Sequence, residues 1–155
     1  MMETEHGARE LSRDECLALL PTVAFGRLVF TEGALPALLT VNFVLDSAGV
    51  VLRTTQGSRI CRAANASVVA FQSDAIDPEH RSGWTVTVVG QANVVTDPLL
   101  ISRLAGLPLS TWVPGERNTF VVVDVGLVSG LRLGGAELAH DPAPAASGAK
   151  AASTA

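Results

Sequence analysis

Three β-rich segments follow one another between residues 23 and 54, and the gaps between them are too short to hold a helix. The segments are VAFGRLVFT (residues 23–31), ALLTVNFVLD (37–46) and GVVLRT (49–54). Parallel neighbours need a crossover of about a dozen residues or more, whereas Gly33, Pro36 and Gly49 supply the chemistry of tight turns. The segments therefore predict an antiparallel meander and disfavour a doubly wound Rossmann sheet.

The second of these segments alternates in polarity. Every second residue from Leu39 to Leu45 is apolar, and Thr40 and Asn42 lie between them. In a strand this pattern puts an apolar face on the core and the two polar side chains on the opposite face. That polar face is either a working surface or an ordinary surface in contact with water.

The remainder of the chain adds short helices and longer strands. A capping box that starts at Ser12 predicts a first helix, which Pro21 ends. A second, short helix is expected to open at Gly57 or Ser58, and Asp97 caps a third. Strands are expected over residues 67–74, 83–97 and 119–133, with loops at 76–83 and 107–118.

These elements predict a mainly β fold. Six or seven strands joined mostly by tight turns, with two or three short helices, favour a barrel, since closing a sheet removes its exposed edges. One folded domain is expected over residues 11–138. The polar residues 1–10 and the Ala/Pro/Ser/Gly-rich residues 139–155 are expected to be disordered.

Composition excludes several classes of function. The 155 residues are 48% hydrophobic and 17% charged, the formal net charge is −4, and Lys150 is the single lysine. No basic face for nucleic acid is therefore expected. No segment approaches the roughly 18 unbroken apolar residues of a membrane helix, the acidic start differs from a secretory signal, and Cys16 and Cys61 are too few for a disulfide scaffold. We expect a cytoplasmic protein with no membrane partner.

The segment RTTQGSRIC places hydroxyl groups, a glycine and an arginine between a strand and a helix. The first N–H groups of a helix that begins near Ser58 have no partner within the helix, and together with the helix dipole they favour an anion. Thr54 and Thr55 add hydroxyl donors. Arg59 adds a guanidinium fork that matches phosphate oxygens, and Gly57 lets the backbone turn closely beneath them. A phosphate monoester needs such donors and no carboxylate nearby. Ser58 as a plain N-cap and Arg59 as a surface residue explain the same spacing.

Other site chemistries find little support. The three histidines are His6, His80 and His140, and two of them lie in the ends that are expected to be disordered. A histidine metal site or a Ser-His-Asp triad is therefore not expected. The acidic loop around Asp77 and Glu79 is expected to be solvated rather than to bind a metal.

The order of motifs adds a resemblance that covers residues 11–133. LSRDECLALL, GRLVF and LPALLTVNF are followed by RTTQGSR, VVAFQSD, GWTVTVVGQANVV and a terminal SGLRL. In this order and spacing, T-x-x-G-S-R and GW-x-V-x-V-x-G-x-A are specific together, and neither is specific alone. The chain resembles the pyridoxamine 5′-phosphate oxidase-like superfamily of FMN-binding split β-barrels, and within it the small nitroimidazole-reductase-like actinobacterial members. The resemblance implies a six- to seven-stranded antiparallel split β-barrel.

The resemblance also implies a cofactor site and a homodimer. In the family the phosphate of FMN is held by a Thr and a Ser-Arg pair, and the strand before them and the start of the GWTVTVVG strand pass beside the flavin ring. Such proteins are typically homodimers with two flavin sites, each built from both chains. The cofactor-binding residues expected here are Thr40, Val41, Asn42, Arg53, Thr54, Thr55, Gly57, Ser58, Arg59, Trp84 and Thr85.

The implied activity is the transfer of hydride or electrons from a nicotinamide to a small oxidised acceptor, such as a nitro compound, a quinone or a tetrapyrrole. No catalytic side chain is expected, because N5 of a flavin carries the hydride. The chain departs from the true oxidases at Ile60, where these often have a lysine, and it lacks their Arg-rich C-terminal signature. Pyridoxamine phosphate is therefore not the expected substrate.

Three alternatives to this interpretation stay open. The same fold could use the deazaflavin F420, whose anionic tail would need Arg53 and Arg62. The chain could instead be a non-enzymatic module that binds flavin or haem. It could also be a dimeric scaffold without a cofactor.

Overall fold

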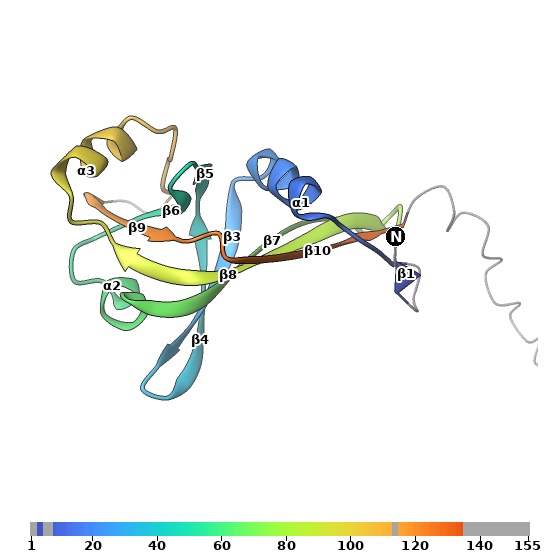
Figure 1. The fold of residues 1–155 in the computed structure, drawn as a ribbon, viewed down its shortest axis with the longest axis horizontal. Helices are drawn as coiled ribbons and strands as arrows, with labels where there is room; N and C mark the ends of the chain where they lie inside the picture. Colours follow the sequence, from blue (N-terminus) through green and yellow to red (C-terminus); the bar gives the residue numbers. More distant parts are fainter. Residues whose placement is uncertain (1–2, 5–7, 113–114, 135–155) are drawn as a thin grey trace, which may run out of the picture.

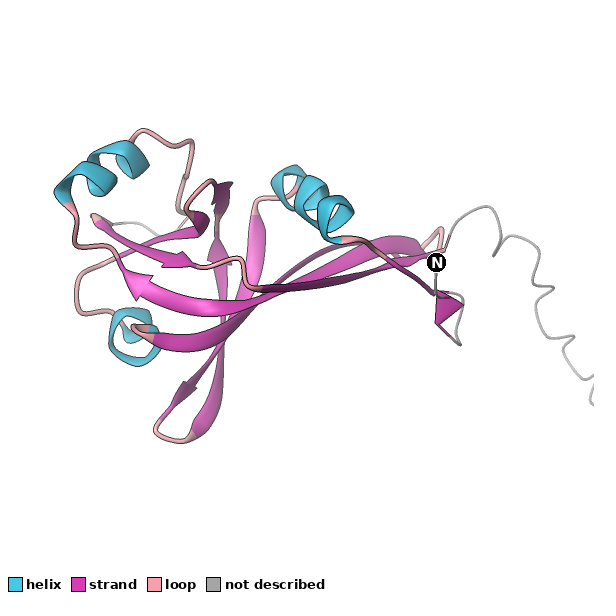
Figure 2. Cartoon of the chain, in the orientation of Figure 1, coloured by secondary structure: helices cyan, strands magenta, loops and turns pink. Residues whose placement is uncertain are grey.

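The computed structural model describes residues 3–4, 8–112 and 115–134. Within these residues, ten strands form one antiparallel sheet with three helices on its outside, which confirms the expected split barrel (Figures 1 and 2). The helices are α1 (Arg13–Leu19), α2 (Arg59–Ala64) and α3 (Pro98–Ala105), and a 3-10 turn, Leu20–Thr22, follows α1. The strands are β1 (Glu3–Thr4), β2 (Ala8–Glu10), β3 (Phe25–Glu32), β4 (Leu35–Asn42), β5 (Val44–Asp46), β6 (Gly49–Thr54), β7 (Ser67–Asp77), β8 (Ser82–Val94), β9 (Thr119–Val123) and β10 (Leu127–Leu133).

Seven of the strands form a ring that is open at one point. β4, β3, β7 and β8 are hydrogen-bonded side by side, and the ladder continues from β8 through β9 and β6 to β5. β5 follows β4 directly along the chain, with Phe43 between them, but the described ladder does not pair these two strands. The Phe43 N–H donates to the carbonyl of Ala24 at 3.3 Å, and its buried ring lies 4.7 Å from that of Phe71. The barrel is therefore split at Phe43.

β7 and β8 extend beyond the ring as an arm, which β10 and β2 widen (Figure 1). One edge of β8 pairs first with β10 and then with β9, and the chain passes between those two strands at residues 124–126. There the Asp124 N–H donates to the carbonyl of Gln91 at 2.9 Å, and the Asp124 carbonyl lies against Gly90. The prediction of a single strand over residues 119–133 is therefore wrong, because the chain leaves the ring and joins the arm at this contact.

Two further sequence predictions need correction. The segment 37–46 is divided at Phe43, and β6 pairs with β5 and β9 rather than with β4. The meander therefore holds only for the hairpins β3–β4 and β5–β6. In the arm, β7 continues to Asp77 through residues that the sequence predicts as loop, because Ile76 and Asp77 pair with β8.

The N-terminal segment is partly ordered. The prediction that residues 1–10 are all disordered is wrong for residues 8–10, which form β2 and pair with the free edge of β10. Ala8 and Leu11 are both 8% exposed, so apolar burial adds to the strand hydrogen bonds and holds this segment. The tail predicted as disordered, 139–155, lies outside the described residues.

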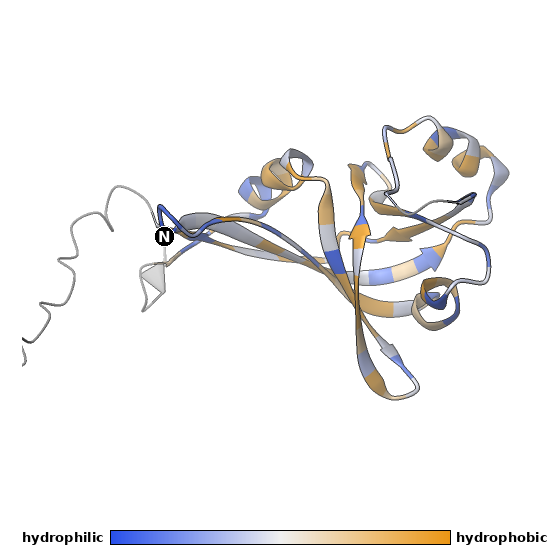
Figure 3. Ribbon diagram, turned by 180° about the vertical axis from the view of Figure 1, so that it is seen from behind, coloured by the Kyte–Doolittle hydropathy of each residue, from blue (hydrophilic) through white to orange (hydrophobic). Residues whose placement is uncertain are grey.

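Two apolar clusters fill the molecule. The larger one fills the ring and extends under α1 along the arm, and it includes Leu28, Phe71 and Val86. The smaller one lies between α3 and the outer faces of β6 and β9, where Val51 meets Leu104. Helix α3 accordingly carries both hydrophobic and hydrophilic residues, and its hydrophobic ones pack against this cluster (Figure 3). Among the described residues, no helix is both long and apolar enough to cross a bilayer.

The contact at Gly90 generates a stability prediction. A Cβ at this position would lie 1.8 Å from the Asp124 carbonyl oxygen, so Gly90→Ala must push β9 and β10 away from β8. We expect a loss of at least about 2 kcal/mol in the free energy of unfolding, measured by urea denaturation. The matched control is Gly106→Ala, whose Cβ would meet its nearest atom at 3.5 Å and should change stability by less than about 0.5 kcal/mol. Equal stability of the two variants would contradict the described passage from β9 to β10.

Candidate functional site

The end of β6 and the start of α2 bring two hydroxyl groups together. Thr54 Oγ1 donates to Ser58 Oγ at 3.0 Å, and the Thr54 residue is only 3% exposed. Ser58 Oγ also accepts the N–H of Cys61 at 3.3 Å, so Ser58 is the N-cap of α2, as the sequence predicts. The corner is therefore preformed. Because α2 has only six residues, its anion-binding capacity rests on these side chains and on Arg59 rather than on a helix dipole.

Arg59 faces a carboxylate that the sequence analysis did not expect in the corner. Its Nε donates to both carboxylate oxygens of Glu32, at 2.8 and 2.9 Å, and its guanidinium lies 5.6 Å from the centre of the Phe30 ring. Glu32 ends β3 and is 27 residues from Arg59 in sequence, so no local motif indicates the pair. The terminal nitrogens of Arg59 have no hydrogen-bond partner among the described residues and stay available to a ligand.

The turn between β6 and α2 is open. Thr55 and Gly57 are exposed, and no atom lies within 4 Å of where a Cβ on Gly57 would be. The φ angle of Gly57 is +70°, a conformation that glycine adopts without strain. The corner can therefore receive a group from solvent without moving the backbone.

The structure does not bring Arg53 to this corner. Successive residues of a strand point to opposite faces, so Thr54 faces the same way as Leu52 whereas Arg53 faces the other way. The Nε of Arg53 donates to the carbonyl of Arg117, and its guanidinium lies 5.3 Å from the centre of the Phe120 ring. Arg53 therefore contributes to packing near β9 and not to the corner of the same chain.

On β4 the predicted residues divide between the two faces. Val41 packs against the apolar interior, whereas Thr40 and Asn42 lie on the outer face. The Oδ1 of Asn42 accepts the backbone N–H of Trp112 at 3.3 Å, and the Trp112 ring meets Phe25 edge-on, with centroids 4.3 Å apart. Trp112 is 71% exposed and therefore presents an aromatic surface beside Asn42. The sequence did not indicate this residue, because it lies in a segment predicted as an irregular loop.

Trp84 and Thr85 lie away from the corner of their own chain. Trp84 is 6% exposed, belongs to the main core and pairs with Ala75 and Arg132 in the arm. The end of α2 instead lies near Ala92, at the other end of β8. Thr85 points out of the arm and lines a cavity of about 460 Å³ with Thr87 and Ser129, among others. The structure therefore does not bring Trp84 and Thr85 to the corner of the same chain.

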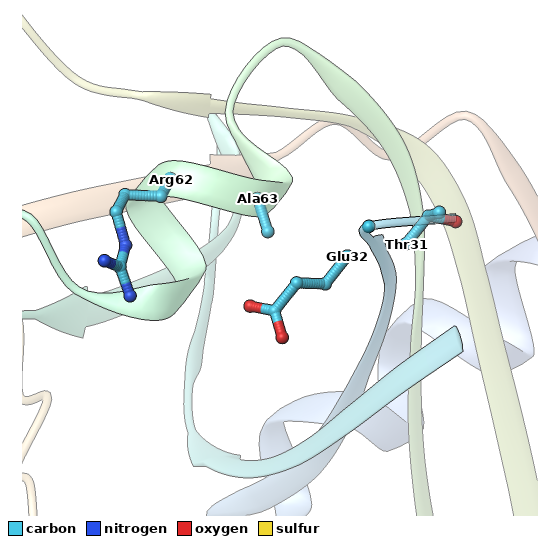
Figure 4. Close-up of a pocket in the computed structure, with 5 residues that line it drawn as sticks. Thr31, Glu32, Arg62 and Ala63 are labelled. Carbon is cyan, nitrogen blue, oxygen red and sulfur yellow. The ribbon is translucent and has the colours of Figure 1, made fainter. Parts of the chain in front are cut away.

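A second cavity opens directly beside Arg59. It has a volume of about 420 Å³ and lies between the turn that joins β3 to β4 and the last turn of α2. Figure 4 shows the Glu32 side chain reaching from the hairpin towards α2, from which Arg62 and Ala63 extend. The cavity is lined by Thr31, Glu32, Gly33, Arg62 and Ala63, and we call it the α2–hairpin pocket.

Outside the corner, the described groups with a shifted pKa include one buried thiol and one carboxylate in an ion pair. Burial, with a smaller contribution from Glu15, raises the pKa of the Cys16 thiol above its ordinary value. The N–H of Ala48, followed by Arg103, lowers the pKa of Asp46 in a surface ion pair. No group of three or more metal-ligating side chains occurs among the described residues.

The comparison with known proteins decides the family. The model of the family described as pyridoxamine 5′-phosphate oxidase matches residues 12–131. The chain belongs to this family. An uncharacterized protein of Mycobacterium tuberculosis is 39% identical over 129 residues, which cover 80% of this chain and 84% of that protein. Family membership confirms the resemblance stated from the motifs.

Two solved structures share both fold and sequence with this chain. The FAD binding protein from Mycobacterium smegmatis is 32% identical, with a TM-score of 0.68, and the match covers 80% of this chain and 96% of that one. A conserved protein of unknown function from Corynebacterium diphtheriae is 30% identical, with a TM-score of 0.69 and coverage of 82% and 98%. The alignments therefore span nearly the whole of each relative.

Proposed function

We propose that this member of the pyridoxamine 5′-phosphate oxidase family is a flavin-binding oxidoreductase. Its corner would hold the phosphate that FMN and the FMN half of FAD have in common. The observation that carries the proposal is the Thr54–Ser58 hydroxyl pair next to the free terminal nitrogens of Arg59. The similarity to the FAD binding protein from Mycobacterium smegmatis supports a flavin.

The residues of the corner fit a phosphate group. A hydroxyl both accepts and donates, so Thr54 and Ser58 can turn their hydrogens towards phosphate oxygens. The Arg59 guanidinium keeps four terminal N–H donors after its Nε has bonded to Glu32, and a planar fork of this kind matches phosphate oxygens. The open turn at Gly57 leaves room for the approach.

A bound flavin supplies hydride and electron transfer through its own ring system, and the protein provides position and polarity. Thr40 and Asn42 offer polar groups on the outer face of β4, where the family places the flavin ring. Trp112 adds an exposed aromatic ring beside Asn42. The donor would be a nicotinamide and the acceptor a small oxidised compound such as a nitro compound, a quinone or a tetrapyrrole. No side chain is assigned an acid–base step.

The F420 alternative is less well supported by the geometry. Its long anionic tail would need both Arg53 and Arg62 in one groove, but Arg53 packs against Phe120 and bonds to the Arg117 carbonyl on the other face of β6.

We also propose a cytoplasmic location, which fits the free thiols of Cys16 and Cys61.

We further propose a homodimer formed through the outer face of the sheet. An apolar row crosses five neighbouring strands of this face, and the exposed Leu38 and Leu127 form its two ends. Contiguous apolar surface of this kind marks an interaction site. A second subunit on this face would also let the partner's arm reach the corner, as a two-chain flavin site needs. The row consists of Leu38, Val29, Ala70, Val89 and Leu127.

Removal of Arg59 tests the flavin site. Arg59→Ala removes a charge-assisted contact of about 1.5–3 kcal/mol, so its affinity for FMN should fall about tenfold or more, measured by isothermal titration calorimetry. Riboflavin has no phosphate and should bind the variant and the parent protein equally. Arg59→Lys keeps the positive charge but lacks the guanidinium fork, so its affinity for FMN should lie between those of the parent protein and of Arg59→Ala. Unchanged FMN affinity in Arg59→Ala would remove Arg59 from the site.

A charge in the apolar row tests the dimer. Leu38 is 60% exposed in the single chain, so Leu38→Glu should leave the fold intact but place a carboxylate in the subunit contact. We expect sedimentation velocity to show a dimer for the parent protein and a monomer for the variant. The control is Leu99→Glu on α3, which is 82% exposed, lies outside the row and should remain dimeric. A dimeric Leu38→Glu would contradict this interface.

A further inference from the structure

We infer that Arg53 and Arg117 form a second anion site, which binds the 2′-phosphate of the nicotinamide donor and so selects NADPH over NADH. The inference rests on the proposed function, because it names the donor of the proposed flavin reaction. Three observations carry it: a buried arginine nitrogen without a partner, two neighbouring arginines without an ion pair, and a loop that joins them to the surface expected beside the flavin ring.

The side chain of Arg117 holds a buried hydrogen-bond donor that is not used. Its Nε is shielded from solvent and has no hydrogen-bond partner among the described residues, although the residue as a whole is half-buried. An unpaired buried donor on a charged group is costly, and few such groups occur in folded proteins. No ion pair reaches Arg117 from any described carboxylate. An anionic oxygen that enters beside the exposed part of the side chain would supply the missing acceptor.

Arg53 brings a second guanidinium to the same place. Its Nε donates to the Arg117 carbonyl and its guanidinium lies against the Phe120 ring, so two contacts position the side chain. Its terminal nitrogens have no hydrogen-bond partner, and no ion pair, within the part of the chain that the structure describes. Arg53 and Arg117 therefore hold two positive charges on adjoining segments, and neither is neutralised as Arg59 is by Glu32.

Two arginines without a carboxylate favour an anion that carries two charges. A phosphate monoester carries about −1.5 to −2 at neutral pH, and the guanidinium fork matches its oxygens. NADPH has one such group, the 2′-phosphate of its adenosine, and NADH has none. Arginine is also the residue that accommodates this phosphate in Rossmann folds. The pair therefore has the chemistry that distinguishes the two nicotinamide donors.

The loop between α3 and β9 links the two arginines to the surface expected beside the flavin ring. In this loop the Trp112 N–H donates to Oδ1 of Asn42 on β4, and five residues later the Arg117 carbonyl accepts from Arg53 on β6. Five residues span at most about 18 Å, a length that an extended dinucleotide covers between its nicotinamide and its 2′-phosphate. A donor whose nicotinamide lies at β4 can therefore place its 2′-phosphate at the arginine pair.

Titration calorimetry of the FMN-loaded full chain with NADP⁺ and with NAD⁺ tests the inference, because the two nucleotides differ only in the 2′-phosphate. We expect NADP⁺ to bind about tenfold more tightly or better, as one added charge-assisted contact predicts. Arg53→Ala and Arg117→Ala should each reduce this difference by weakening NADP⁺ alone. The control Arg103→Ala removes an equal charge from α3 and should keep the difference.

Titration of the same proteins with FMN separates the inference from the proposed function. Both arginine variants should bind FMN as the parent protein does, and a fall in FMN affinity would instead assign the pair to the flavin phosphate and overturn the inference. In the parent protein, equal affinity for NADP⁺ and NAD⁺, or binding of neither, would also overturn it and leave the flavin corner standing. The same holds if both variants keep the parent preference. A parent protein that binds no flavin would overturn the proposed function and the inference together.

Discussion

The burial of Phe43 is the constraint on which the arrangement of the site depends. At this residue the chain leaves the β3–β4 side of the ring and enters the β5–β6 side, and no strand ladder joins the two within the described residues. The aromatic contact with Phe71 and the hydrogen bond to Ala24 hold the opening together. β4 before the crossing carries Asn42, and β6 after it carries Thr54. The split therefore places the strand expected beside a flavin ring and the strand that ends at the phosphate corner on opposite sides of the opening.

The corner combines a preformed pair of hydroxyl groups with an arginine whose charge is partly offset by a neighbouring carboxylate. The Thr54–Ser58 pair is fixed by strand burial and by the cap of α2. Arg59, by contrast, is held by Glu32 from a different hairpin, so any anion that enters must interact with a neighbouring carboxylate as well as with the guanidinium. Glu32 therefore offsets part of the positive charge that Arg59 offers to such an anion.

Local chemistry in the sequence predicts much of this structure, and long-range contacts account for what it does not predict. Ser12, Ser58 and Asp97 each accept the backbone N–H that their capping patterns predict. The separation of Arg53 from Thr54 follows from strand alternation, a signal that was available in the sequence. The Glu32–Arg59 pair is different, because it joins segments 27 residues apart. The break at Phe43 was also hidden, because an apolar residue still occupies every second position from Leu39 to Leu45.

The measurement that tests the account most directly is the mass and stoichiometry of what the purified protein carries. Heat release of bound small molecules, followed by mass spectrometry and absorbance spectroscopy, should give one flavin per chain. Protein that lacks a flavin should regain one after incubation with FAD and gel filtration. A protein that carries no flavin as purified, and retains none after incubation with FMN or FAD, would contradict the claim that the Thr54–Ser58–Arg59 corner is a flavin phosphate site.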